Sequence, residues 1–111
     1  MPDPSSEAPV LDLLAAMTAE SVARCDLDAN SLIAARLAAL AAVDAPAASY
    51  LVHIGPAVDA GVTIEQVQDI LIAVAPIIGT ARTLSAAENV TAALDLAIVA
   101  LDALDAQESG E

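Results

Sequence analysis

The chain has 111 residues and is 58% hydrophobic, which is enough for one domain with its own core. Its 16 acidic residues face only three basic ones, and the net charge of −13 excludes nucleic acid and anionic membrane surfaces as partners, because both are bound through cationic side chains. Alanine, leucine, isoleucine and valine supply most of the apolar content, and Tyr50 is the only aromatic residue, a composition that favours an all-α fold. Since such small side chains bury little area inside one subunit, we also expect apolar surface to be buried between subunits.

Neither a membrane span nor a signal peptide is expected. The longest apolar run, residues 70–78, is less than half of the roughly 20 residues that a span requires, and Pro76 interrupts it. Residues 1–8 are rich in proline, serine and acidic side chains and are predicted to be a disordered tail rather than a basic leader. A single cysteine, Cys25, cannot form an internal disulfide, which predicts a cytoplasmic protein.

The remaining residues predict a single helical domain over 9–106 with about five helices. Helical spacing of apolar residues begins near Pro9 and ends around Arg24, and a turn over residues 26–30 offers Asp28 or Asn30 as the N-cap of the next helix. That second helix should cover about 31–43, because Pro46 prevents it from continuing.

A third helix is expected over about 47–60, with a kink or a one-turn break after His53 where Gly55 and Pro56 follow. Gly61 supplies a left-handed C-cap. Thr63 and the glutamine three residues later form a capping box that starts the fourth helix. This helix is apolar on all sides, so we expect it to be buried all round and to end at Pro76 and Gly79.

The last helix is predicted to run from Thr80 to about Ala106, followed by an acidic tail over 107–111. Its larger apolar side chains are expected to pack inward, and an acidic stripe with seven-residue spacing to face water. The inward residues are Leu94, Ile98, Leu101 and Leu104, and the stripe consists of Glu88, Asp95 and Asp102.

Four residues are considered as candidates for catalysis or ligand binding. His53, the only histidine, can move a proton near neutral pH, although a half-buried structural histidine is the alternative. Arg36 lies on an apolar helix face and either pairs with a carboxylate or holds an anionic substrate group. Arg82, at the start of the last helix, is unfavourable toward the helix dipole, which predicts a partner such as Glu88 or a bound anion. Cys25 is interpreted as structural or incidental, and one histidine with scattered carboxylates is a weak signal for metal, so no metal site is expected.

Residues 49–82 combine a predicted helix that contains the histidine, a Gly-Val-Thr turn and a second predicted helix followed by Gly-x-x-Arg. Their sequence is SYLVHIGPAVDAGVTIEQVQDILIAVAPIIGTAR. This order resembles the carboxymuconolactone decarboxylase and alkyl hydroperoxidase D families, over about residues 31–105. The resemblance implies their helical fold, assembly as homotrimers or hexamers, and a place for His53 in the active-site pocket. The peroxidases of these families carry two cysteines where this chain has Pro46 and Ser49, so peroxidase activity is not expected.

Two functions of different class follow from the resemblance. The first is a cofactor-free enzyme of the decarboxylase type, acting on a small carboxylated or cyclic metabolite. In that enzyme His53 would transfer a proton, Arg36 or Arg82 would hold an anionic group, and Tyr50 would line the pocket. The second is a catalytically silent, acidic oligomeric scaffold built on the same fold.

Overall fold

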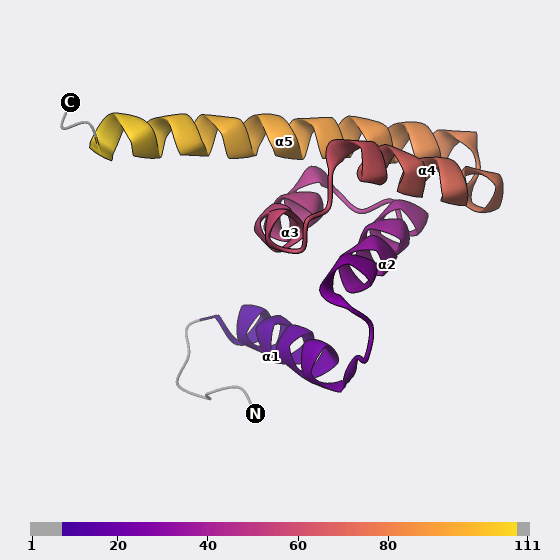
Figure 1. Ribbon diagram of the computed structural model, residues 1–111, viewed down its shortest axis with the longest axis horizontal. Helices are drawn as coiled ribbons and strands as arrows, with labels where there is room; N and C mark the ends of the chain where they lie inside the picture. The colour runs from indigo at the N-terminus through magenta and orange to yellow at the C-terminus, as the bar shows by residue number, and fades with distance from the viewer. Residues whose placement is uncertain (1–7, 109–111) are drawn as a thin grey trace.

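The computed structural model describes residues 8–108, and within them every regular element is an α-helix, which confirms the all-α prediction. In chain order the helices are α1 (Pro9–Arg24), α2 (Ala29–Ala42), α3 (Ala47–Asp59), α4 (Ile64–Ile78) and α5 (Thr80–Glu108) (Figure 1). The predicted N-terminal tail lies outside the described residues apart from Ala8. Gln107 and Glu108, predicted to belong to the C-terminal tail, are part of α5, and the rest of that predicted tail lies outside the described residues.

Side-chain caps begin two of the helices at the predicted residues. Asp28, rather than Asn30, is the N-cap of α2, and its carboxylate accepts a 2.7 Å hydrogen bond from the Ser31 amide. The hydrogen bonds from the Ser31 amide and hydroxyl hold the Asp28 pKa below its ordinary value of 3.8. The Thr63 hydroxyl likewise accepts from the Gln66 amide at 3.0 Å and begins α4.

The ends of α2 and α3 share one hydrogen-bond pattern around a left-handed residue. At the end of α3, Gly61 has φ 76° and the Val62 amide donates to the Ala57 carbonyl at 2.9 Å. At the end of α2 the left-handed residue is Asp44, with φ 55°, and the Ala45 amide donates to a carbonyl five residues back. Both ends are Schellman motifs, which satisfy carbonyls that a helix end leaves unpaired. The Gly61 cap was predicted, whereas the left-handed Asp44 was not.

Two prolines lie inside helices without ending them. α3 is continuous through Pro56, so the predicted one-turn break after His53 does not occur. Pro76 is likewise inside α4, which ends two residues later, before Gly79 at φ 89°. Glycine is therefore the residue that stops α4, because a positive φ suits it and few others.

Helices α2 to α5 form a bundle around a core rich in alanine. α5 packs along α3, α4 and α2, and α4 also packs on α2 (Figure 1). Small side chains let the helix axes approach closely, so the core is thin and has few large members. Its buried residues are Ile33, Leu37, Ala41, Ala45, Tyr50, Ala86 and Ala93.

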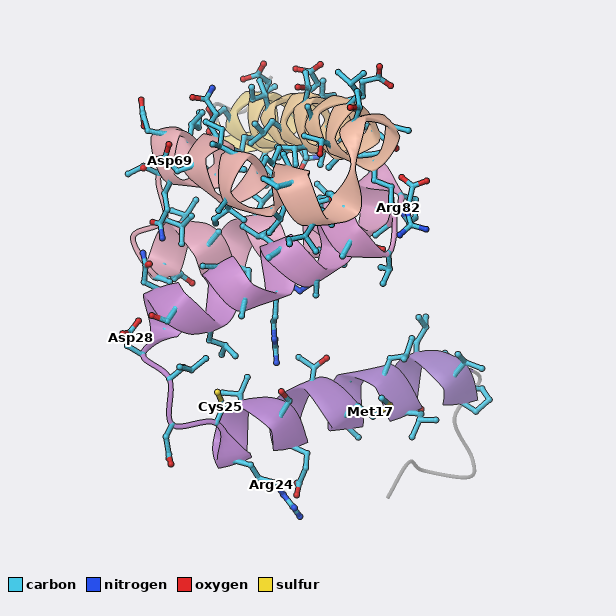
Figure 2. All side chains as sticks on the ribbon, turned by 90° about the vertical axis from the view of Figure 1, so that its right-hand side faces the viewer. Met17, Arg24, Cys25, Asp28, Asp69 and Arg82 are labelled. Carbon is cyan, nitrogen blue, oxygen red and sulfur yellow. The ribbon has the colours of Figure 1, made fainter. Side chains whose placement is uncertain are left out.

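α1 stands apart from this bundle (Figures 1 and 2). Within residues 8–108 it packs against none of the other helices and has no buried residue. A hydrogen bond from the Arg36 guanidinium to the Ser21 hydroxyl, at 3.0 Å, connects α1 to α2 of the bundle. The exposed apolar side chains of α1 are Val10, Leu11, Leu13, Leu14, Met17 and Val22.

Two predictions about burial are wrong for the single chain. α4 is not buried all round: it has no fully buried residue, and Ile72 and Ile77 are 68% and 86% exposed. On α5, Leu94 is half-buried, but the three apolar residues predicted to pack inward after it are more than half exposed, namely Ile98, Leu101 and Leu104. They are exposed because α5 extends past the helices that cover its first half (Figure 1). The acidic stripe does face solvent as predicted.

By length and composition, α5 is the one helix among residues 8–108 that is long and apolar enough to cross a membrane. The longest unbroken apolar run, residues 70–78, on which the sequence prediction was based, lies in α4. The apolar character of α5 was missed because its alanines and larger apolar residues are interrupted by polar ones. Core helices of soluble bundles meet the same criterion, and α5 packs on three other helices, although only 11% of its apolar stretch is buried.

Candidate functional site

A pocket of about 260 Å³ opens between the second half of α3, the first half of α4 and the middle of α5. The Schellman turn at Gly61 links α3 to α4, and the two residues that follow it, Val62 and Thr63, line the pocket. Leu37 contributes from α2. The lining residues are Leu37, Tyr50, His53, Ile54, Ala57, Val58, Val62, Thr63, Ile64, Val67, Gln68, Leu71, Ala87, Val90, Thr91, Ala93 and Leu94.

His53 lines this pocket from α3 and is half-buried. Its Nδ1 atom lies 2.7 Å from the Ser49 carbonyl oxygen, one helical turn back. A carbonyl only accepts hydrogen bonds, so Nδ1 carries the proton and donates. In the neutral imidazole this leaves Nε2 as the atom with a free lone pair, able to accept a hydrogen bond or a proton.

Tyr50 lies three residues before His53 on α3, so both side chains share one face of the helix. The residue is 3% exposed and lines the pocket, and its hydroxyl has no hydrogen-bond partner within residues 8–108. The hydroxyl oxygen is itself fully buried, so the ring rather than the hydroxyl forms the pocket wall. Burial first, and then the negative charge of Asp44, raises the Tyr50 pKa above its ordinary value of 10.0.

The two arginines proposed to hold an anionic group do not line the pocket. The carboxylate partner expected for Arg36 is not found among residues 8–108, where this side chain donates instead to Ser21 of α1. Arg82 donates to the Ala42 carbonyl at 3.0 Å, in the last turn of α2. A cation at a helix C-terminus is favourable toward the dipole, which explains a position that is unfavourable toward α5 alone.

The other titratable groups lie away from His53. Cys25 directly follows α1, and its sulfur is on the side of that helix that faces the bundle (Figure 2). The carboxylates around the Gly61 turn, at Asp59, Glu65 and Asp69, do not line the pocket. No group of three or more histidine, cysteine or acidic side chains in residues 8–108 could hold a metal ion.

Sequence reasoning missed the polar contacts around the pocket. The side-chain amides of Asn30 and Gln66 pair reciprocally, at 3.0 Å and 2.6 Å, and tie the start of α2 to the start of α4. The capping box is therefore half formed: Thr63 caps α4, while the Gln66 side chain turns to Asn30. These two amides are 36 residues apart, so only a signal of long-range contact could have found them. Thr63, Gln68 and Thr91 are further lining residues that were not singled out.

No family model matches the chain, and no match is found among curated proteins or solved structures. The resemblance over residues 31–105 therefore stays a hypothesis that rests on the residues quoted above.

Proposed function

We propose that the protein is a cofactor-free enzyme of the carboxymuconolactone decarboxylase type, a homotrimer or hexamer that acts on a small carboxylated or cyclic metabolite. The observation that carries the proposal is the position of His53: the side chain lines a mainly apolar pocket, and Nδ1, one of its two ring nitrogens, is already hydrogen-bonded. A histidine fixed in this way is suited to proton transfer, because its orientation and tautomer are set before a ligand arrives.

In this proposal His53 acts as a general base through Nε2. The proton taken from the substrate would give an imidazolium, and the Ser49 carbonyl would stabilise that cation through the Nδ1 hydrogen bond. The same imidazolium then returns the proton to another atom of the substrate. The mainly aliphatic walls would strengthen these interactions, since charges interact more strongly at low dielectric.

The experiment is an isotope-exchange assay on the whole protein. A panel of cyclic ketones and lactones, including carboxymuconolactone, is incubated in D₂O and followed by NMR for deuterium uptake or loss of carbon dioxide. His53→Ala should lower the rate by about 10²–10⁴-fold. Val52→Ala, which changes an exposed residue of the same helix outside the pocket lining, serves as the matched control. Exchange that survives in His53→Ala would refute the role of this residue.

A second candidate function, the silent oligomeric scaffold, is favoured by the unpartnered apolar side chains of α1. Both functions require assembly, so the oligomer alone does not separate them. His53→Ala does: an enzyme should keep its oligomer and melting temperature, whereas a scaffold should lose about 1–3 kcal/mol, because the change removes a half-buried hydrogen-bonding side chain. A panel without any turnover, together with a weakened oligomer, would favour the scaffold.

We propose that the exposed apolar side chains of α5 are buried against other copies of the chain rather than in a membrane. Glu88, Asp95 and Asp102 recur along this helix and all face solvent, and carboxylates are costly in a bilayer and are repelled by anionic lipids. A cytoplasmic location is proposed from the single cysteine.

A further inference from the structure

The pocket lining contains no arginine, lysine, aspartate or glutamate. Its polar members are Tyr50, His53, Thr63, Gln68 and Thr91, and two of the hydroxyls already take part in helix hydrogen bonds: Thr63 as a cap and Thr91 to the Ala87 carbonyl at 2.9 Å. A carboxylate entering the pocket would lose its hydration without gaining a cationic partner, which is expensive. The net charge of −13 opposes an anion further. The ligand that this lining accepts is therefore uncharged.

His53 adds a requirement for polarity at one point. Since Nδ1 donates to the Ser49 carbonyl, Nε2 of the neutral ring can only accept. A ligand that satisfies this atom must offer a hydrogen-bond donor, such as a hydroxyl group. The remaining walls are mainly aliphatic side chains and alanine, which suit a hydrocarbon frame.

The size of the pocket sets the scale of the ligand. A cavity of about 150 Å³ is enough to bind benzene, and the pocket here is about 260 Å³. We propose that the pocket binds an uncharged, mainly apolar ring compound, somewhat larger than benzene, that donates one hydrogen bond to Nε2 of His53. This inference rests on the proposed function, since it names the substrate class of the same pocket. It removes acidic lactones from that class, and because an uncharged substrate has no carboxylate to lose, it leaves proton transfer by His53 as the reaction.

Three probes of similar size separate the possible ligand chemistries. Phenol is neutral and offers a donor, anisole is neutral without a donor, and benzoate is an anion at neutral pH. Binding of each to the full-length protein is measured by isothermal titration calorimetry, with NMR of the His53 ring as a second readout. Phenol should bind about ten-fold more tightly than anisole, as one hydrogen bond is worth about 1.4 kcal/mol, and benzoate should bind weakest.

Three variants test whether the probes bind in this pocket. His53→Ala should remove the preference for phenol over anisole, and Ala57→Phe should abolish binding of both by filling the pocket. Val52→Ala, an exposed neighbour on the same helix that does not line the pocket, should change neither. Melting curves confirm that each variant is folded.

Each remaining outcome contradicts the inference. Benzoate as the tightest probe would show a cationic site, equal binding of phenol and anisole would remove the role of Nε2, and absence of all binding would mean that a second copy or water fills the pocket. These failures differ from failure of the proposed function. Benzoate binding together with isotope exchange would support the proposed enzyme and reject the uncharged ligand class. Phenol binding that depends on His53, without any isotope exchange, would support the ligand class and reject the proposed enzyme.

Discussion

The bundle of α2 to α5 and the separate helix α1 use similar apolar residues with different results. In the bundle, Ile33 and Leu37 are 5% and 7% exposed, because α3, α4 and α5 cover them. On α1, Val10, Leu13, Leu14 and Met17 together follow helical spacing as well, yet Leu13 and Leu14 are about half exposed, at 48% and 49%. Periodicity therefore reveals that a helix has an apolar face, but not whether the partner of that face belongs to the same chain.

The largest expected effect comes from the bundle. Leu37→Ala should lower the free energy of unfolding by about 2–5 kcal/mol, because it opens a cavity in a core that contains few large side chains. Denaturant titration measures the change. The volume-conserving Leu37→Met is the matched control and should cost less than about 1.5 kcal/mol. Equal stability of Leu37→Ala and the parent protein would show that this core is not the one that holds the chain together.

Next in size is a change on α1. Leu14→Asp should weaken the oligomer at least about ten-fold, because a side chain worth roughly 1.5–3 kcal/mol when buried would be replaced by a charge. Analytical ultracentrifugation over a concentration series measures this. Ala19→Asp adds the same charge on the opposite face of α1 and should leave assembly unchanged. A wild-type monomer of 11.1 kDa at micromolar concentration would refute the oligomer altogether.

The amide pair between Asn30 and Gln66 tests how firmly α4 is held to α2. Asn30→Ala and Gln66→Ala should each cost about 1–3 kcal/mol, since either change leaves a half-buried amide without its partner. The double variant should be hardly worse than one of the single variants, and thermal melts of the four proteins give the coupling energy. Strictly additive losses would mean that the two side chains act independently.

The smallest effect is expected at Tyr50. Tyr50→Phe should be neutral or stabilising by up to about 1 kcal/mol, since it removes a buried hydroxyl that has no partner in residues 8–108. Because the folded state raises the Tyr50 pKa, the unfolded chain loses this proton first, and stability should fall as pH rises above the ordinary value of 10.0. Melting temperatures on either side of that pH measure the fall, which should be smaller in Tyr50→Phe. A destabilised Tyr50→Phe would indicate a hydrogen bond to this hydroxyl.

Local chemistry made most of the helix ends predictable. Asp28 and Thr63 cap through amides three residues away, and Gly61 turns the chain at a single position, so short windows of sequence contain the whole signal. Asp44 was missed because aspartate is compatible with several backbone conformations, and only the surrounding packing selects the left-handed one. A one-turn break near Pro56 and an end of the fourth helix at Pro76 were also expected, but α3 and α4 both continue through these prolines.

The site was predictable only in part, and for the same reason. Tyr50 and His53 are three residues apart on one helix, so their shared face follows from sequence, and both line the pocket. The position of Arg82 depends instead on where the end of α2 lies after folding, and that of Arg36 on where α1 lies. Neither can be obtained from helical spacing.

The hydrogen bonds that join the start of α5 to the end of α2 bear on how the protein is made. Arg82 bonds to the carbonyl of Ala42, and Ser85 donates to the Asp44 carboxylate at 2.5 Å, contacts that bridge 40 and 41 residues of chain. Because α5 follows the other helices, a nascent chain on the ribosome cannot form these contacts until α5 has emerged. During synthesis α2, α3 and α4 would therefore expose the surfaces that α5 later covers, a period in which chaperones have access to them.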